Sequence, residues 1–308
     1  MKIGIIGGGG RVGSNAAYAL QTTGTGSEIV LLDANREAAD GEALDLRHGS
    51  AMSSSQRIRS GDYADLEGAE CVVITAGLRR KPDESRLELI NRNVDLFRSV
   101  LASLKPVRLA DDCVILVVSN PVDVLTYLAV KESGLPSQRV IGLGTVLDTC
   151  RFRSLLAEKF AVGATDVEAL ILGEHGDSMV PIWSSATIGG ASIKSFQGAS
   201  MDDLNAIFDY TKKGGAEVIR LKGGAGYAVG ISIQQVVRAI ESDSQAILPV
   251  SALQNGALGI RDVCLSLPTT VGRKGVVAIH EPSVDDNERS LLAKSSQALS
   301  ETNRQVMG

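Results

Sequence analysis

The chain has 308 residues, of which 44% are hydrophobic and only 4% are aromatic, and its formal net charge at pH 7 is −5. A chain of this length is better explained by two packed domains than by one. Its core must consist mainly of aliphatic side chains, which favours an α/β protein with a buried parallel sheet. The acidic balance gives no electrostatic reason to expect a nucleic-acid partner, and no apolar run approaches the length needed to span a bilayer.

The cysteines and the start of the chain point to a reducing compartment. The sequence begins Met1-Lys2 and continues directly into an apolar segment, without the charged and apolar regions of a secretory signal. The four cysteines form no C-x-x-C pair, which argues against a zinc site and a disulfide framework; they are Cys71, Cys113, Cys150 and Cys264. We therefore expect a cytoplasmic protein that neither binds a metal nor enters a membrane.

A glycine-rich turn lies between the first predicted strand, residues 2–6, and the first predicted helix, residues 11–20. Its glycines satisfy both G-x-G-x-x-G and G-x-x-G-x-x-G. Glycine lets the backbone turn sharply and approach a pyrophosphate, while the helix directs free N–H groups at the anion. Alone, such a motif can be only a turn. In its strand-and-helix context it predicts a dinucleotide site formed by Gly7, Gly8, Gly10, Arg11, Val12 and Gly13.

An acidic residue follows the second predicted strand, residues 28–32. Asp33 stands 20 residues after Gly13, the spacing at which a carboxylate meets the adenosine ribose hydroxyls of a dinucleotide. The same carboxylate would repel a 2′-phosphate, so we expect NAD rather than NADP, although Arg36 lies close enough to weaken that preference. The structural alternative is that Asp33 caps the helix predicted over residues 36–46.

Strands and helices alternate along the first half of the chain. Further strands are predicted at 71–75, 114–118 and 139–141, separated by helices at 85–105 and 121–133. This alternation predicts a doubly wound parallel sheet, that is, a Rossmann domain, over residues 1–142. Residues 143–308 are expected to form a second, α+β substrate-binding domain, with strands at 180–188, 191–195, 245–251, 263–271 and 275–279 and helices at 202–221, 226–242 and 284–306.

The candidate proton carrier is His175, which follows an apolar run at 167–172. An imidazole exchanges a proton near neutral pH if a carboxylate holds its other nitrogen. For a lone histidine, however, a structural role is the better explanation. Asp148 and Arg151 are three residues apart on a predicted helix and can face one cleft, yet alone they would be explained as a solvated helix start.

Several motifs together resemble the L-lactate and malate dehydrogenase family. They are Gly-Glu-His-Gly-Asp-Ser at 173–178, Leu-Asp-x-x-Arg-Phe at 147–152, Ser-Asn-Pro-Val-Asp at 119–123, and Ser-Arg-Leu at 85–87 followed by Arg-Asn at 92–93. The resemblance extends to Gly-Ile-Arg-Asp-Val-Cys-Leu-Ser-Leu-Pro at 259–268. It therefore covers nearly the whole chain, with its motifs in the family order.

The resemblance implies a role for each matching residue. His175 matches the proton acceptor, and Asp148 matches the carboxylate that orients it. Arg151 matches the arginine that grips the substrate carboxylate in two parallel hydrogen bonds, a task suited to a planar guanidinium. Arg86 matches the arginine that polarises the reacting carbonyl. The resemblance also places Asn120 beside both substrate and nicotinamide, and it adds Asn93 and Val118 to the cofactor site.

The expected substrate depends on Arg80, six residues before Arg86. In the family, malate dehydrogenases have arginine at this position and lactate dehydrogenases have glutamine. A second carboxylate entering a closed site needs a cationic partner, so we expect reversible oxidation of (S)-malate to oxaloacetate. The run at residues 80–82 can also be a charged surface loop, but its register with Arg86 favours the substrate role. The alternative function is an L-lactate or other 2-hydroxy acid dehydrogenase.

Two other classes of function stay open on the sequence alone. One is a hydrolase, since some NAD-dependent glycosidases are built on a related framework and need a divalent metal. The other is an NAD-binding protein without activity. The resemblance further implies a homodimer or homotetramer, with residues 33–49 as a contact surface.

Overall fold

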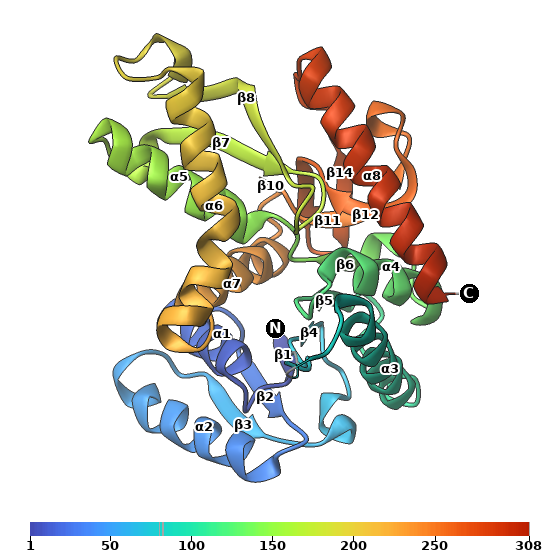
Figure 1. The fold of residues 1–308 in the computed structure, drawn as a ribbon. Helices are drawn as coiled ribbons and strands as arrows, with labels where there is room; N and C mark the ends of the chain where they lie inside the picture. The colour runs from blue at the N-terminus through green and yellow to red at the C-terminus, as the bar shows by residue number, and fades with distance from the viewer. Residues whose placement is uncertain (80, 82, 308) are drawn as a thin grey trace.

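The computed structural model describes residues 1–79, 81 and 83–307 and is built around one large sheet (Figure 1). Its eight strands lie in the order β12-β11-β6-β5-β4-β1-β2-β3. Their bounds are β1 (Lys2–Ile6), β2 (Glu28–Leu32), β3 (Arg57–Ser60), β4 (Cys71–Ile74), β5 (Val114–Val117), β6 (Val140–Gly142), β11 (Ser251–Asn255) and β12 (Arg261–Ser266). The strands from β3 to β6 are parallel, which confirms the predicted doubly wound sheet.

Helices cover both faces of this sheet because its strands are apolar on both sides. Ile3 and Ile5 of β1 join one hydrophobic cluster, while Ile6 joins the other. The helices that carry these clusters from the amino-terminal half are α1 (Arg11–Thr22), α2 (Arg36–Gly49), α3 (Arg86–Leu104) and α4 (Val122–Glu132). Side chains of α1 and α2 pack in the first cluster, and side chains of α3 and α4 pack in the second.

The carboxyl-terminal half adds two three-stranded sheets, in the orders β7-β8-β9 and β10-β13-β14. In Figure 1, α5, α6, β7 and β8 lie to the upper left of the large sheet and α8 to the upper right. The bounds are α5 (Val146–Phe160), β7 (Val167–Leu172), β8 (Val180–Ile188), β9 (Ala191–Ser192), α6 (Met201–Lys222), α7 (Tyr227–Ser242), β10 (Ala246–Leu248), β13 (Thr269–Gly272), β14 (Gly275–Ile279) and α8 (Asp286–Met307). In the described part of the chain, no helix is both long and apolar enough to cross a membrane.

The two halves of the chain share the large sheet. Ser251 of β11 pairs antiparallel with Gly142 of β6, and β12 pairs antiparallel with β11. Helix α7 also lies directly against α1, because a Cβ atom at Gly230 would lie 2.6 Å from the backbone oxygen of Asn15. Strands from both sides of residue 142 therefore form one continuous sheet. The boundary between two domains at that residue stays a prediction.

Several strand predictions are wrong in detail. Strand β3 was not predicted, because Ile58 is the only buried residue of this edge strand and the apolar signal is correspondingly weak. The strand predicted over 245–251 contains β10 and only the first residue of β11, which belong to different sheets, and the strand predicted over 191–195 is reduced to β9. The strand predicted over 263–271 is two strands in different sheets, β12 and β13, with Pro268 between them. Proline lacks the N–H group that would continue a ladder, so the chain leaves one sheet there and enters another.

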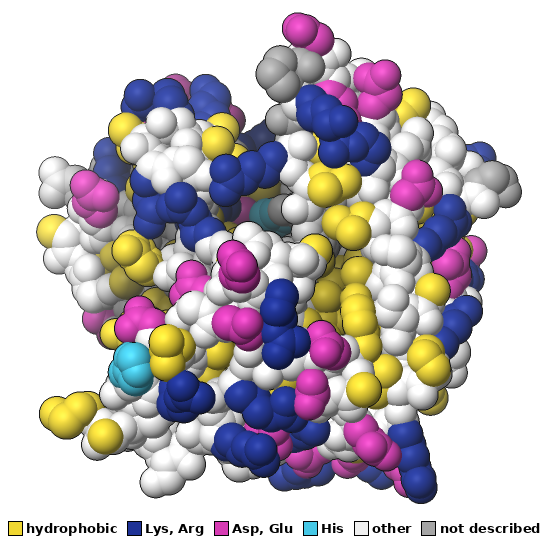
Figure 2. Space-filling view, turned by 90° about the horizontal axis from the view of Figure 1, so that it is seen from below, with side chains coloured by type: hydrophobic (Ala, Val, Ile, Leu, Met, Phe, Trp, Pro, Cys, Tyr) yellow, Lys and Arg dark blue, Asp and Glu magenta, His cyan; other side chains and the backbone are white. Residues whose placement is uncertain are grey.

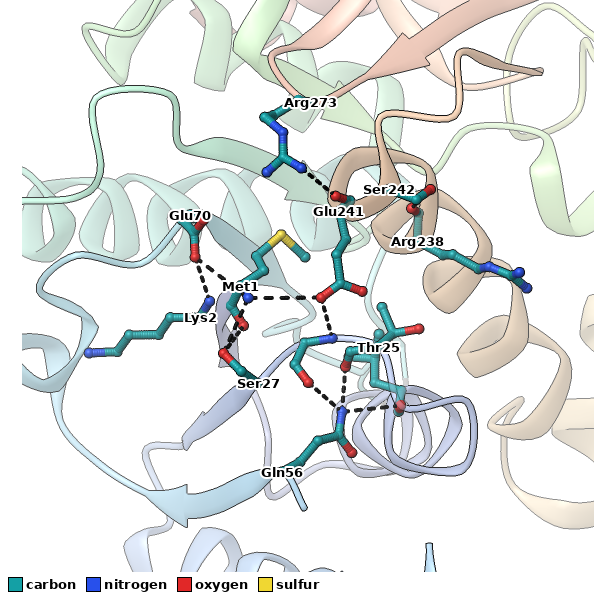
Figure 3. A network of polar contacts seen from close by, with 12 residues as sticks. Met1, Lys2, Thr25, Ser27, Gln56, Glu70, Arg238, Glu241, Ser242 and Arg273 are labelled. Atoms are coloured by element: carbon teal, nitrogen blue, oxygen red, sulfur yellow. Dashed lines mark hydrogen bonds and ion pairs between the residues drawn. The ribbon is translucent and has the colours of Figure 1, made fainter. Parts of the chain in front are cut away.

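A polar network joins α7 to the loop before β2 (Figure 3). Glu241 Oε1 accepts a hydrogen bond from the Gly26 amide at 2.8 Å and lies 3.8 Å from the amino group of Met1. On the other side of the loop, Gln56 Nε2 donates to the carbonyls of Thr25, at 2.5 Å, and Gly26, at 2.9 Å. Glu241, from the carboxyl-terminal half, thus accepts the hydrogen bond of the Gly26 amide in the loop before β2.

We predict that Glu241→Ala lowers the free energy of unfolding by about 1–3 kcal/mol, because the Gly26 amide loses a charged acceptor. Glu241→Gln keeps an acceptor oxygen at the same place and is expected to lose less. Urea unfolding of both variants measures the difference. Equal losses for the two variants would contradict this assignment of the hydrogen bond.

Candidate active site

The turn between β1 and α1 is packed so closely that it excludes side chains. Gly7 has φ +91°, and its amide and that of Gly8 both donate to the Leu32 carbonyl at 2.8 Å. A Cβ atom at Gly13 would lie 2.3 Å from the Gly7 carbonyl oxygen, far inside van der Waals contact. The first turn of α1 therefore rests on the glycine turn, and its amino terminus is held beside the carboxyl end of β1.

This turn fits the pyrophosphate and ribose of a dinucleotide. Helix α1 has no side-chain cap at its amino terminus, so its first backbone N–H groups can serve an anion. Asp33 follows β2, and its Oδ2 accepts from the Gly9 amide at 3.1 Å. The capping alternative for Asp33 is wrong, because the residue whose side chain caps α2 is Asn35.

Arg36 does not oppose the expected preference for NAD. Its Nε donates to Asp40 at 2.9 Å and its Nη1 donates to Asp62 at 2.9 Å. The hydrogen bond to Asp40 is the main cause of the raised pKa of Arg36. Two carboxylates therefore already hold the guanidinium of Arg36, which weakens the objection that it raised to NAD.

The remaining cofactor candidates lie on α1, on α3 and just after β5. Arg11 and Val12 open α1. The Asn93 side chain is buried: its Oδ1 accepts from the Leu78 amide at 2.8 Å and its Nδ2 donates to the Leu89 carbonyl at 3.1 Å. Asn93 thus ties the segment after β4 to α3. Val118 follows β5, where its amide donates to the Ile74 carbonyl at 2.9 Å, and Asn120 is exposed two residues further on.

His175, Asp148 and Arg151 come together, as the sequence predicts. His175 Nδ1 lies 2.5 Å from Asp148 Oδ2, and Arg151 Nη1 donates to Asp148 Oδ1 at 2.8 Å. The Asp148 side chain is 1% exposed, against 23% for His175 and 20% for Arg151. A buried carboxylate is therefore shared between two partly exposed groups, and each of its oxygens has one partner.

Helix α5 and strand β7 set this geometry. Thr149 Oγ1 accepts from the Ile171 amide at 3.1 Å, and Thr145 Oγ1 donates to the Ile171 carbonyl at 2.5 Å. These threonines fasten the first turns of α5, which carry Asp148 and Arg151, to the strand that ends just before His175. The two motifs meet because their helix and strand are joined by side chain to backbone hydrogen bonds.

The contact between Asp148 and His175 lowers the pKa of the carboxyl and raises the pKa of the imidazole. Burial would raise the pKa of the Asp148 carboxyl, but the charges of His175 and Arg151 outweigh it, and the pKa is lowered. Burial would likewise lower the pKa of the His175 imidazole, but the charge and hydrogen bond of Asp148 raise it. The pair therefore favours a carboxylate beside an imidazolium, which is an arrangement suited to storing and delivering a proton.

Arg86 lies on the rim of the site. It is the first residue of α3, where Ser85 and Glu88 form a capping box. Its Nη1 donates to Asp177, and its Nη2 lies 3.7 Å from Glu174 Oε1. The structure therefore brings Arg86 to the loop that carries His175, with its side chain 64% exposed. Arg80, which carried the substrate prediction, lies outside the described residues.

Asp123 is a residue to which the sequence analysis gave no role. It is buried in the first turn of α4, and its Oδ2 accepts from the His175 backbone amide at 2.7 Å. Its position at the end of the Ser-Asn-Pro-Val-Asp motif, just past a strand, was the available signal. Only the fold shows that this motif reaches the histidine loop.

Figure 2 shows a hollow in the molecule, with a histidine side chain at its floor and Lys and Arg side chains around it. Such a surface suits a small anionic substrate. Among the described residues, no group of three or more His, Cys, Asp or Glu side chains could hold a metal ion. The arrangement joins a dinucleotide cradle to a proton-exchanging pair, which defines an NAD-dependent oxidoreductase.

The comparisons with known proteins identify the family. Residues 1–142 match the lactate/malate dehydrogenase NAD-binding domain, and residues 145–307 match the lactate/malate dehydrogenase alpha/beta C-terminal domain. The chain belongs to the lactate/malate dehydrogenase family, whose members are NAD-dependent 2-hydroxy acid dehydrogenases. The resemblance found in the sequence, the Rossmann fold and the NAD cofactor are thereby confirmed.

Individual relatives are similar over their whole length. L-lactate dehydrogenase 1 of Clostridium acetobutylicum is 43% identical, over 98% of this chain and 97% of that protein. L-lactate dehydrogenase of Acetivibrio thermocellus is 43% identical, over 97% and 95%. The crystal structure of the minor L-lactate dehydrogenase of Enterococcus mundtii is 39% identical, covers 99% of this chain and 98% of its own, and has a TM-score of 0.95.

These relatives overturn the expected malate dehydrogenase activity. That expectation depended mainly on the identity of one charged residue, Arg80, which lies outside the described residues. The full-length relatives named here are lactate dehydrogenases. The physical reason for the error is that a charge in the sequence does not show whether its side chain reaches the substrate.

We predict that Gly13→Ala weakens NADH binding at least about tenfold and lowers the free energy of unfolding by about 1–3 kcal/mol, because the added methyl group meets the Gly7 carbonyl. Gly41→Ala is the matched control. A Cβ atom at Gly41 of α2 has nothing within 4 Å, so that change is expected to leave NADH binding unchanged. Fluorescence titration and thermal unfolding measure both. Wild-type affinity in Gly13→Ala would contradict the assignment of the turn.

Proposed function

We propose that this protein catalyses the reversible, NAD-dependent reduction of pyruvate to L-lactate. The observation that carries the proposal is the contact of His175 with the Asp148 carboxylate that also holds Arg151. The proposed substrate follows from the relatives. They are L-lactate dehydrogenases, and their similarity to this chain covers nearly their entire lengths. Gly7, Gly8, Gly10, Arg11, Val12, Gly13, Asp33, Asn93, Val118 and Asn120 are proposed to hold NAD.

Arg151 is proposed to bind the substrate carboxylate. Its guanidinium carries five N–H groups, and Nη1 donates to Asp148, so the others can grip two carboxylate oxygens. The adjacent part of α6 approaches it with glycines: a Cβ atom at Gly215 would be in van der Waals contact with both Nη atoms, at 3.8 Å. Asp148 holds the guanidinium in one orientation, and this lowers the entropy lost when the substrate binds.

His175 is proposed to donate the proton in reduction. Its Nδ1 faces Asp148, which leaves Nε2 to deliver the proton to the oxygen at C2 of pyruvate, and Asp148 remains a carboxylate that stabilises the imidazolium. NADH supplies the hydride in this direction. In the oxidation of lactate, the neutral imidazole takes the hydroxyl proton back.

Arg86 is proposed to stabilise the charge that develops on the substrate oxygen. In this structure its guanidinium pairs with Asp177 and Glu174. To act on the carbonyl, it must turn from these carboxylates into the cleft. That movement would also help to exclude water from the proton transfer.

The assembly and location of the protein stay proposals. A homodimer or homotetramer, with residues 33–49 as a contact surface, is supported by Leu44 of α2, whose side chain is exposed. A cytoplasmic location follows from the sequence expectation alone.

The substrate is tested by measuring kcat/KM for NADH oxidation with pyruvate, oxaloacetate and longer 2-oxo acids, and then repeating the series with NADPH. We expect the highest kcat/KM with pyruvate, and NADH to be preferred because Asp33 repels a 2′-phosphate. A preference for oxaloacetate would contradict the proposal. No turnover with any 2-oxo acid would favour a protein that only binds NAD.

The direction of the His175 pKa shift gives a pH prediction. Reduction needs the imidazolium, and the pKa of His175 is raised above its usual 6.5. Pyruvate reduction is therefore expected to stay constant through pH 6.5 and to fall only above the raised pKa, while lactate oxidation rises through the same pKa. Initial rates between pH 5.5 and 9.5 measure both. A reduction rate that already declines below pH 6.5 is the contrary outcome.

A further inference from the structure

Asp123 links the nucleotide-binding half to the candidate proton donor. It lies in the first turn of α4, and its side chain is 2% exposed. Its neighbours Val124 and Leu125 are buried in two hydrophobic clusters, so the helix cannot readily move the carboxyl group. Its Oδ2 accepts from the His175 backbone amide at 2.7 Å. A carboxylate from α4 therefore fixes the backbone of His175 through a hydrogen bond.

The second oxygen of Asp123 makes no hydrogen bond of normal length and geometry, and the Ser251 hydroxyl is the side-chain donor near enough to lower the pKa of the carboxyl. Across the described residues, Asp123 Oδ1 and Ser251 Oγ are both buried atoms without a hydrogen-bond partner. Burying a carboxylate with a single hydrogen bond is unfavourable unless a positive charge lies nearby. An asparagine or a threonine could accept the same amide hydrogen bond without that charge. A cation stabilises such a buried carboxylate, and His175 is a group whose positive charge acts on Asp123.

The charged groups around the ring can be named from each side. From α5, Asp148 raises the pKa of His175 and Arg151 lowers it, and from α4 Asp123 raises it. Asp123 is itself governed mainly by burial, which raises its pKa to about 6, against the lowering effects of Ser251 and His175. Asp123 is thus charged at neutral pH, where the imidazolium is needed, and becomes neutral in mild acid.

We propose that Asp123 is a positioning residue for proton transfer, which fixes the backbone of His175 through Oδ2 and supplies a second negative charge, in addition to Asp148, that stabilises the protonated ring. In this arrangement both halves of the chain contribute a carboxylate to one imidazole: Asp148 from the carboxyl-terminal half and Asp123 from the amino-terminal half. The catalytic part of this inference rests on the proposed function, whereas the electrostatic part does not.

The decisive variant is Asp123→Asn, which keeps an acceptor for the His175 amide and removes the charge. We expect kcat/KM for pyruvate reduction to fall roughly 3- to 10-fold at pH 8, because less of His175 is protonated, and to change little at pH 5.5. Lactate oxidation at pH 6 is expected to rise, because the neutral ring becomes more abundant. General damage to the site would instead lower both directions at every pH.

The matched control is Asp262→Asn. Asp262 is an exposed aspartate that accepts from Tyr127 and Lys131 further along α4, so this variant also removes a carboxylate beside that helix. Its pH profiles are expected to equal those of the wild type. Ser251→Ala is a second, milder variant, which should shift the profiles in the same direction as Asp123→Asn, since loss of the hydroxyl makes Asp123 easier to protonate.

A direct measurement keeps the test independent of turnover. The chain has three histidines, so NMR titration of labelled histidine, with His48→Gln and His280→Gln for assignment, follows the His175 pKa itself. A lower pKa in Asp123→Asn, or in Ser251→Ala if the first variant does not fold, supports the proposal even if no 2-oxo acid is a substrate. An unchanged pKa in a folded Asp123→Asn, or a uniform rate loss without a shifted profile, would overturn it.

Discussion

The hydrogen bond between His175 and Asp148 is the interaction on which the rest of the site depends. Asp148 is almost completely buried, and a buried carboxylate is stable only where cations and donors surround it. The imidazole and the Arg151 guanidinium meet that need together. The Arg151 guanidinium and the His175 imidazole are thus held by one charge, so their spacing cannot vary independently. The threonines that join α5 to β7 turn this electrostatic requirement into a fixed geometry.

Much of the fold could be predicted from sequence because the local signals agreed. The apolar runs, the glycine turn and Asp33 each indicate a nucleotide-binding βαβ unit, and the structure forms it. Prediction failed where tertiary pairing decided the outcome. Strand β3 has one buried residue, and the run through Pro268 divides between two sheets. Neither the edge of a sheet nor a change of partner leaves a periodic pattern in the chain.

The site likewise contains residues that sequence motifs could identify and residues that only the tertiary structure shows. His175, Asp148 and Arg151 were identified from motifs, and the fold brings them together. Asp123 was missed because its partner is a backbone amide 52 residues away, which no side-chain pattern records. Asn93 was expected at the cofactor. In the structure its side-chain oxygen accepts a hydrogen bond from the Leu78 amide, in the segment after β4. This contact depends on where α3 packs. The malate prediction from Arg80 was wrong for a related reason: residue identity was known, but placement relative to the pocket was not.

The shared sheet limits how this protein can close over a ligand. Strand β11 is hydrogen-bonded to β6, and α7 is packed against the backbone of α1 at Gly230. A rigid-body rotation of one half against the other would have to break the ladder and separate those two helices. The shared sheet therefore favours closure by segments at the edge of the molecule, with the glycine turn and the His175–Asp148 pair kept at a fixed separation.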